Sequence, residues 1–225
     1  MLMKLLDDKE KIYLLDDNNF DFPTLNMMKD DLVAIGGDFH PQRIVNAYQN
    51  GIFPWFIDEY NYIHWFSPKK RMVLYPEEFR LTKSLKRVIK NKGFVIKSNE
   101  RFEDVIKSCA NIKRKHEDST WISHEFIQAY TNLFHLEYAF SIECYLDDKL
   151  VGGLYGLLIG DVFCGESMFS LEKDASKVAF YHLCNQAKQN GIKIIDCQVY
   201  NEHLASLGAK EIPREEYFKI LKNNS

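Results

Sequence analysis

Residues 192–199 read Ile-Lys-Ile-Ile-Asp-Cys-Gln-Val, and this stretch decides the fold more than any other part of the chain. It is short, rich in β-branched side chains and preceded by Gly191, which is typical of a buried strand. Side chains alternate faces along a strand, so Asp196 and Gln198 are predicted on one face and Cys197 on the other. A carboxylate and a carboxamide would then project together from a core strand.

A second apolar strand, residues 162–168 (Val-Phe-Cys-Gly-Glu-Ser-Met), carries another acid, Glu166. Two interpretations of these polar groups are open. Buried polar residues usually satisfy groups of the protein itself, so Asp196 could cap a helix and Gln198 could bind a stray backbone group. Acids gathered on apolar strands also mark functional sites, and the presence of Glu166 makes us favour that interpretation.

The composition limits the possible classes of protein. The chain of 225 residues can bury a substantial core in one large or two smaller domains. No apolar run is long enough to span a bilayer, and the acidic N-terminal segment lacks the basic start of a signal peptide, so no membrane association is expected. Five cysteines without a Cys-x-x-Cys pair predict a cytoplasmic protein, and seven scattered histidines indicate no metal site; no cofactor is expected.

One segment contrasts with the net charge of −3: residues 80–97 contain seven basic residues and no acid. Four apolar residues at helical spacing predict an amphipathic helix there: Leu81, Leu85, Val88 and Ile89. Its other face carries Lys83, Lys86, Arg87 and Lys90. A charged helix face that is merely solvated normally mixes both signs, so the absence of acids favours contact with phosphate.

The apolar pattern predicts the order of the elements. Helices are expected at 41–48, 102–109 and 124–136, and a short strand at 94–97. From residue 139 the order is β-β-β-α-β-α-β, with strands at 139–146, 150–159, 162–168 and 192–199, a helix at 174–190, a short helix ending near 208, and a final element through 217. The predicted fold class is α+β: a small α/β domain at residues 1–68, then a mixed-sheet core at 69–225 that resembles the acetyltransferase (GNAT) type.

Several motifs also occur in one order along the chain. They are Gly36-Gly37-Asp38, residues 47–56, Trp65-Phe66-Ser67-Pro68, Thr120-Trp121-Ile122, residues 151–156, residues 165–170, Ala175-Ser176-Lys177, Asp196-Cys197-Gln198, and residues 206–209 followed by Ile212-Pro213-Arg214. In this combination the chain resembles the bacterial leucyl/phenylalanyl-tRNA-protein transferase family. The resemblance implies an enzyme that moves Leu, Phe and less readily Met from an aminoacyl-tRNA to a protein beginning with Arg or Lys, which marks that protein for degradation.

The resemblance also implies roles for residues. The catalytic residues would be Asp196, Gln198 and Glu166. The amino-acid pocket would comprise Trp55, Trp121, Leu154, Phe163, Gly165, Leu183, Ala187 and Ile195. The acceptor stem and 3′ end of the tRNA would bind Arg80, Lys83, Lys86, Arg87 and Lys90. The enzyme is expected to be a monomer.

The implied reaction is aminolysis of an ester by a protein α-amino group. That amine has an ordinary pKa of about 7.7–8.0, so no strong base is required, and the site must mainly supply proximity and stabilise an oxyanion. We expect Asp196 to accept a hydrogen bond from the amine and Gln198 to orient it through its carbonyl oxygen. Which of the two receives the proton stays open. Glu166 would bind the cationic side chain of the acceptor or orient the adenosine of the donor.

One conflict within the sequence predicts a local irregularity. Strict alternation places Phe163 and Glu166 on opposite faces, whereas the resemblance puts both in one site. A bulge or an opening of the strand at Gly165 is therefore expected.

Three other functions remain to be compared with aminoacyl transfer. A CoA-dependent N-acetyltransferase needs a glycine-rich turn for pyrophosphate, but residues 170–174 (Ser-Leu-Glu-Lys-Asp) have no glycine and two acids. A thiol acyltransferase could use Cys197 with His203, although Cys197 is predicted on the face opposite Asp196. A non-catalytic module that binds RNA or protein N-termini is the third.

Overall fold

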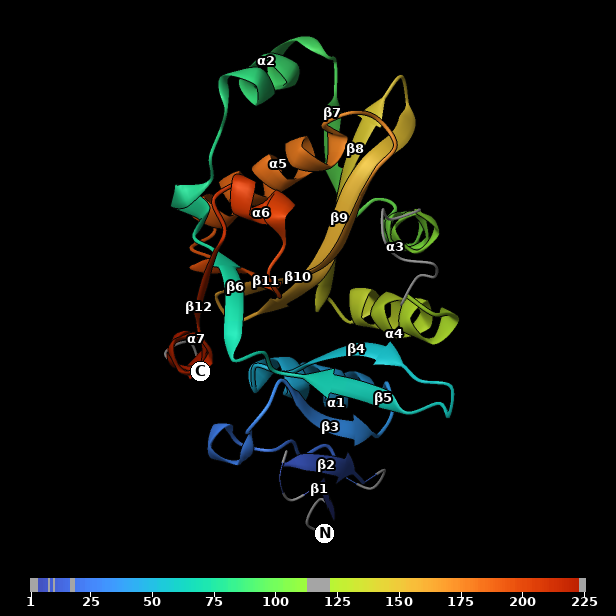
Figure 1. Ribbon diagram of the computed structural model, residues 1–225. Coiled ribbons are helices and arrows are strands. Elements are labelled where there is room, and N and C mark those ends of the chain that lie inside the picture. Colours follow the sequence, from blue (N-terminus) through green and yellow to red (C-terminus); the bar gives the residue numbers. More distant parts are fainter. Residues whose placement is uncertain (1–3, 8, 10, 17–18, 113–121, 223–225) are drawn as a thin grey trace.

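The chain folds into two mixed β-sheets, one below the other in Figure 1. This computed structural model describes residues 4–7, 9, 11–16, 19–112 and 122–222. The first sheet has the order β1-β2-β3-β5-β4. Its strands are β1 (Lys4–Asp7), β2 (Ile12–Leu15), β3 (Leu32–Gly36), β4 (Phe53–Ile57) and β5 (Ile63–Phe66), joined by the 3-10 turn η1 (Leu25–Met27) and helix α1 (Pro41–Gln49).

The second sheet has the order β12-β6-β11-β10-β9-β8-β7, and its one parallel pair among the described residues is β10 with β11. Its strands are β6 (Lys70–Leu74), β7 (Val95–Ser98), β8 (Ala139–Leu146), β9 (Lys149–Ile159), β10 (Val162–Ser170), β11 (Ile194–Gln198) and β12 (Lys210–Pro213). The helical segments are η2 (Pro76–Glu78), α2 (Lys83–Asn91), α3 (Phe102–Asn111), α4 (His124–His135), α5 (Ala175–Gln189), α6 (Glu202–Ser206) and α7 (Arg214–Lys222).

The central strands of this sheet are covered on both faces. Apolar side chains of α3 and α4 pack on one face, around Tyr155 and Cys164, and those of α5 pack on the other, around Phe163 and Ile195. Helix α5 starts close against β9, since a Cβ at Gly152 would lie only 2.6 Å from the Cβ of Ala175. Burial on both faces explains why β9, β10 and β11 are nearly continuous apolar runs.

The predicted elements agree with the structure over most of the chain. The order β-β-β-α-β-α-β from residue 139 is confirmed as β8-β9-β10-α5-β11-α6-β12, and the expected mixed α/β architecture is observed. Asp147 and Asp148 make the predicted turn between β8 and β9 with φ values of 48° and 59°, as a type I′ hairpin requires.

Three expectations were wrong or incomplete. Strand β6 was not predicted, although it lies between β11 and β12 in the sheet. The last element is not a single strand, because helix α7 follows β12. The basic helix packs less deeply than expected: Leu85 is buried, whereas Leu81 is 37% exposed.

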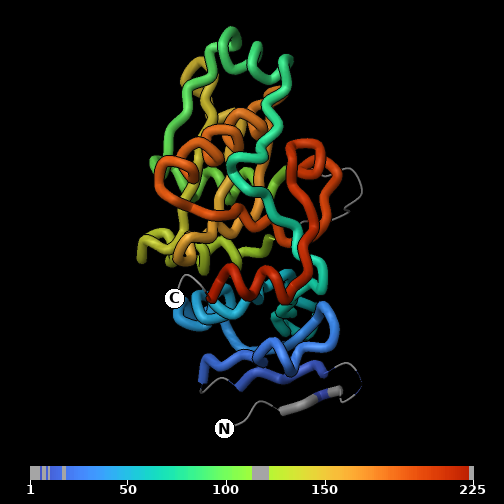
Figure 2. The backbone as a smooth tube through the Cα atoms, turned by 90° about the vertical axis from the view of Figure 1, so that its left-hand side faces the viewer, coloured from blue at the N-terminus to red at the C-terminus, as the bar shows by residue number. Residues whose placement is uncertain are grey.

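The division of the chain at residue 68 stays a prediction. All strands of the first sheet precede Ser67 and all strands of the second follow it. One cluster of buried residues nevertheless spans both sheets, and α7 lies across the junction between them in Figure 2. Tyr48 of α1 therefore reaches Glu166 on β10, and Tyr217 of α7 reaches Asp196 on β11.

Candidate functional site

The second sheet opens between its two parallel strands. β10 and β11 pair as far as Cys164 and Asp196, where the pairing ends. Just after Gly165, β10 shifts register against β9, and just before Gln198, β11 shifts register against β6. The irregularity expected at Gly165 is therefore confirmed, and β11 contains a second one beside it. Bulges bend the strands that contain them, so the two strands separate here.

A cavity of about 370 Å³ lies at this opening. Six of the eight residues predicted for the amino-acid pocket line it: Trp55, Leu154, Phe163, Gly165, Leu183 and Ile195. Glu166, Gln198, Asn201 and His203 add polar groups to the same wall. An apolar wall with a few polar groups is the usual form of a small-ligand site.

The other two residues predicted for the pocket are Ala187 and Trp121. Ala187 is fully buried but is not part of the cavity wall, because the cavity reaches only Phe180 and Leu183 on α5. Its role in the pocket stays a prediction. Ala187 lies one helical turn beyond Leu183, where its carbonyl accepts a hydrogen bond from the backbone N–H of Ile192. Trp121 lies outside the described residues.

Asp196 forms a buried ion pair at the base of this opening. The guanidinium of Arg71 on β6 donates from Nε to Oδ1 at 2.8 Å and from Nη2 to Oδ2 at 2.6 Å. The hydroxyl of Tyr217 on α7 donates to Oδ2 at 2.8 Å. Asp196 has no exposed surface, and its pairing raises the pKa of Arg71, so this guanidinium stays charged.

Arg71 is enclosed in turn by three other contacts. Its Nη1 donates to the carbonyl of Gly51 at 3.2 Å. Its guanidinium lies between the rings of Phe53 and Tyr217, at 4.7 and 4.6 Å from their centroids. The hydrogen bonds and ring contacts needed to keep a charge pair buried are all present.

Gln198 is held at both its backbone and its side chain. Its backbone is left-handed, with φ of 64°, and its N–H donates to Oδ1 of Asp196 at 2.9 Å. Its Nε2 donates to Oε1 of Glu166 at 2.9 Å. The amide oxygen is then left to accept from a group in the cavity. Asp196 thus binds the backbone of Gln198 and Glu166 binds its side chain. Simple alternation along β11 did not predict this arrangement.

Glu166 is held by two tyrosines from separate helices. Tyr48 on α1 donates to Oε1 at 2.5 Å and Tyr130 on α4 donates to Oε2 at 3.1 Å; the two hydroxyls are themselves 2.7 Å apart. Burial raises the pKa of Glu166 to about 7, and the hydrogen bonds from the tyrosines oppose that rise. Its charge therefore changes near neutral pH.

Four residues of this network were not predicted: Tyr48, Arg71, Tyr130 and Tyr217. Tyr48 lies within the run 47–56 that supports the family resemblance, so a signal for it existed. Arg71 lies at the start of a short apolar run after Pro68, which fits a strand. Tyr130 and Tyr217 have no distinguishing pattern in the sequence.

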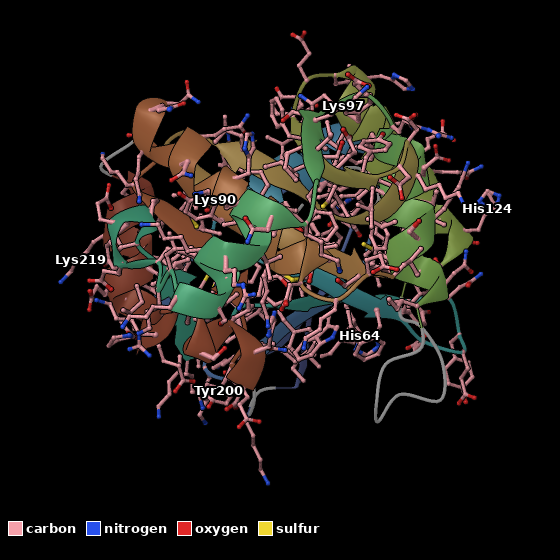
Figure 3. All side chains as sticks on the ribbon, turned by 90° about the horizontal axis from the view of Figure 1, so that it is seen from above. His64, Lys90, Lys97, His124, Tyr200 and Lys219 are labelled. Carbon is pink, nitrogen blue, oxygen red and sulfur yellow. The ribbon has the colours of Figure 1, made fainter. Side chains whose placement is uncertain are left out.

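The predicted basic helix lies apart from the cavity. α2 stands at the end of the molecule farthest from the first sheet, and Lys90 lies on its outer surface (Figures 1 and 3). Arg80, Lys83, Lys86, Arg87 and Lys90 are all exposed. Lys92 at the end of the helix pairs with Glu172 at 3.1 Å, which connects α2 to the turn before α5.

That turn has little capacity for an anion. The N–H of Ala175 donates to the carbonyl of Glu172 and that of Ser176 donates to the hydroxyl of Ser170, so these first amides of α5 are occupied. Glu172 adds a negative charge. A pyrophosphate site at a helix N-terminus needs free N–H groups.

Cys197 lines the cavity, but it is not placed as a nucleophile. Its thiol donates to the carbonyl of Ile195 at 3.7 Å, and burial raises its pKa well above the usual value. The thiolate is the reactive form. Among the described residues, no group of three acids, histidines or cysteines could hold a metal ion, and no helix is long and apolar enough to cross a membrane.

The fold and the cavity define a mixed α/β enzyme with two acids and a carboxamide at its site. The family models of leucyl/phenylalanyl-tRNA protein transferase and of its N-terminal domain match residues 73–222 and 37–69. The chain belongs to this family of aminoacyltransferases.

Three relatives carry the name leucyl/phenylalanyl-tRNA–protein transferase. That of Dechloromonas aromatica is 49% identical over 87% of this chain and 85% of its own length. Those of Flavobacterium psychrophilum and Flavobacterium johnsoniae are 47% and 46% identical, over 89% and 94% of this chain and 95% and 100% of their own lengths. Among solved structures, a GCN5-related N-acetyltransferase from Kribbella flavida is similar at 10% identity and a TM-score of 0.42, over 80% of this chain and 64% of that one.

Replacing Arg71 should show how strongly the ion pair holds the structure. Arg71→Met leaves Asp196 buried without its partner, and we expect the free energy of unfolding to fall by about 3–5 kcal/mol. Adding Asp196→Asn should recover part of that loss. Urea denaturation measures both. Lys97→Met is the control, because it removes an exposed pair with Glu100 and a contact with the ring of Tyr145 and should cost about 1 kcal/mol or less. Equal losses for Arg71→Met and Lys97→Met would contradict this interpretation.

Glu166→Gln should stabilise the protein at alkaline pH. Because the pKa of Glu166 rises from 4.5 to about 7 on folding, the native state holds a proton that the unfolded chain releases. This contribution to stability is complete below pH 4.5 and is lost as the pH rises through 7. The variant should therefore be more stable than the natural protein at pH 8, by at most about 3 kcal/mol, and the gap should narrow at pH 5. Melting curves at the two pH values test this, and a gap of the same size at both would refute it.

Proposed function

We propose that this protein transfers Leu, Phe and less readily Met from an aminoacyl-tRNA to the α-amino group of proteins that begin with Arg or Lys, which creates a degradation signal. The observation that carries the proposal is the cavity between β10 and β11, where an apolar wall meets a carboxamide oriented by two acids. Membership of the transferase family supports it. We also propose that the enzyme is a cytoplasmic monomer.

We also propose that the second sheet and its helices form a core of the GNAT type. A GNAT-type core has a parallel pair of strands that separates to admit its donor, and the end of pairing between β10 and β11 is consistent with that arrangement. The donor differs, however. The occupied amides and the acid in the turn before α5 disfavour CoA pyrophosphate, which supports a donor bound elsewhere.

The amine would be oriented chiefly by Gln198. Its amide oxygen accepts one N–H of the acceptor's α-amine, which directs the nitrogen lone pair at the ester carbonyl. Such positioning contributes up to roughly 7–11 kcal/mol in ideal cases. We revise the role expected for Asp196: its two oxygens already accept four hydrogen bonds, so it acts by holding the backbone of Gln198 and not by binding the amine.

The apolar wall would select the transferred amino acid. Trp55, Leu154, Phe163, Leu183 and Ile195 form a surface suited to Leu, Phe and Met, whose side chains branch no earlier than Cγ. Ile and Val branch at Cβ and would meet the wall near the reacting carbonyl. Burial of one methylene discriminates by only about 1–3 kcal/mol, so steric exclusion must provide the rest.

The basic helix α2 would bind the acceptor stem of the tRNA. Its exposed basic residues with no intervening acid suit a phosphate backbone. Because α2 lies away from the cavity, a donor that spans both would place its stem on α2 and its 3′ end in the cavity.

A donor comparison tests the function directly. Transfer to an Arg-starting peptide should be efficient from leucyl-tRNA, at least about tenfold weaker from isoleucyl-tRNA, and undetectable from acetyl-CoA. Leu183→Phe should narrow the pocket and favour Leu over Phe, whereas Ala187→Phe, outside the cavity wall, should leave the ranking unchanged. Peptide mass spectrometry gives the products. Acetyl transfer, or efficient isoleucyl transfer, would disprove the proposal.

Charge reversal tests the role of α2. Lys83, Lys86 and Arg87 changed together to Glu should raise the Michaelis constant for leucyl-tRNA and weaken its salt dependence, because phosphate contacts determine both. Activity on leucyl-adenosine, which lacks the stem, should be preserved. Reversal of Lys219 and Lys222 on α7 is the matched control. If both donors lost activity equally, α2 would have only a structural role.

A further inference from the structure

The two acids of the site differ in the number of hydrogen bonds that they accept. Asp196 accepts four: two from Arg71, one from the hydroxyl of Tyr217 and one from the backbone of Gln198, two on each oxygen. A carboxylate offers about four acceptor positions, so all of them are occupied. Asp196 therefore has no acceptor position left for an ammonium group in the cavity.

Glu166 accepts from Gln198 and also forms a ring of contacts with two tyrosines, and this ring has one contact more than the tyrosines have hydroxyl hydrogens. Three close contacts link its carboxyl group, Tyr48 and Tyr130 in a ring: each hydroxyl to the carboxyl group, and the hydroxyls to each other. Two phenol hydrogens serve only two of the three contacts. A proton on Glu166 supplies the third, since its O–H can donate to Tyr130 while Tyr130 donates to Tyr48 and Tyr48 donates to Oε1. The ring thus accommodates both the ionised and the protonated acid.

We propose that Glu166, and not Asp196, takes the proton that the α-ammonium group of the acceptor must lose before it attacks. The inference rests on the proposed function and assigns its proton acceptor. Glu166 lines the cavity beside Gln198, whose amide oxygen holds a second N–H of the same group.

An N–H bond of the ammonium breaks and an O–H bond forms on Glu166, which leaves a neutral amine. The nitrogen lone pair forms the new C–N bond at the ester carbonyl, and the ester C–O bond breaks. A second nitrogen proton ends on the departing 3′-oxygen of adenosine, and Glu166 later releases its proton to water.

The electrostatics support this assignment. Burial raises the pKa of Glu166 to about 7, close to that of an α-amine at about 7.7–8.0, so the proton moves between groups of similar affinity. The titratable and charged groups that face Glu166 are Tyr48 on α1, Tyr130 on α4, Arg71 on β6, Asp196 on β11 and Cys164 on its own strand. Tyr155 on β9 packs edge-on against Tyr130.

A matched pair of tyrosine variants separates the two acids. Tyr130→Phe removes a donor to ionised Glu166 and should shift the inflection of the pH–rate profile upward by roughly one pH unit. Tyr217→Phe removes a donor to Asp196 and should leave the inflection in place. Glu166→Gln should abolish it and slow transfer by about 100-fold or more. The measurement is single-turnover leucyl transfer to an Arg-starting peptide from pH 5.5 to 9, with melting curves to verify folding. The amine's own ionisation is common to all variants.

A second readout needs no activity. In protein labelled with ¹³C at glutamate carboxyls, the resonance lost in Glu166→Gln should titrate near neutral pH and shift upward in Tyr130→Phe. An inflection that moves in Tyr217→Phe but not in Tyr130→Phe, or a Glu166 that stays ionised throughout, overturns the inference. If the labelled group titrates as expected but leucyl transfer is absent at every pH, the proposed function fails and takes the catalytic role of Glu166 with it.

Discussion

The buried ion pair of Arg71 with Asp196 is the interaction on which the rest of the site depends. It joins β6 to β11 within the second sheet. Arg71 also donates to the carbonyl of Gly51 in the turn between α1 and β4, and Tyr217 from the last helix donates to Asp196. Segments separated by more than a hundred residues are therefore held together at one point. A buried charge pair is stable only when its hydrogen-bonding groups are matched, and Gly51, Phe53 on β4 and Tyr217 on α7 meet this requirement around Arg71 and Asp196.

The cavity follows from the way that β10 and β11 separate. A sheet with regular pairing has no room between neighbouring strands, since they lie about 5 Å apart. Here two bulges occur side by side, one in each strand, and Gln198 takes a left-handed backbone that its hydrogen bond to Asp196 supports. The ion pair thus does more than stabilise the fold: through Asp196 it also holds the backbone of Gln198, which lines the cavity.

The two carboxyl groups of the site have very different hydrogen-bonding surroundings. A guanidinium and two further donors occupy both oxygens of Asp196, whereas Glu166 is buried among hydroxyls that can donate or accept. The second arrangement costs stability when Glu166 is ionised, as is common for groups whose pKa serves a reaction. Tyr48 and Tyr130 come from helices on different sheets, so the character of Glu166 depends on how the two sheets meet.

The sequence by itself determined the elements and the chemical identity of the site. Period-two and helical patterns located β8 to β11, α3, α4 and α5, because their apolar faces are local properties of the chain. Polar residues within the apolar strands 162–168 and 192–199 marked Glu166, Asp196 and Gln198 as candidates. Only the tertiary structure decided what surrounds each acid. The partners of Asp196 and Glu166 are Arg71, Tyr217, Tyr48 and Tyr130, which are distant in sequence and carry no periodic signal. Bulges also break the alternation from which faces are predicted. Proton affinity is set by neighbours in space, and a linear pattern does not contain them.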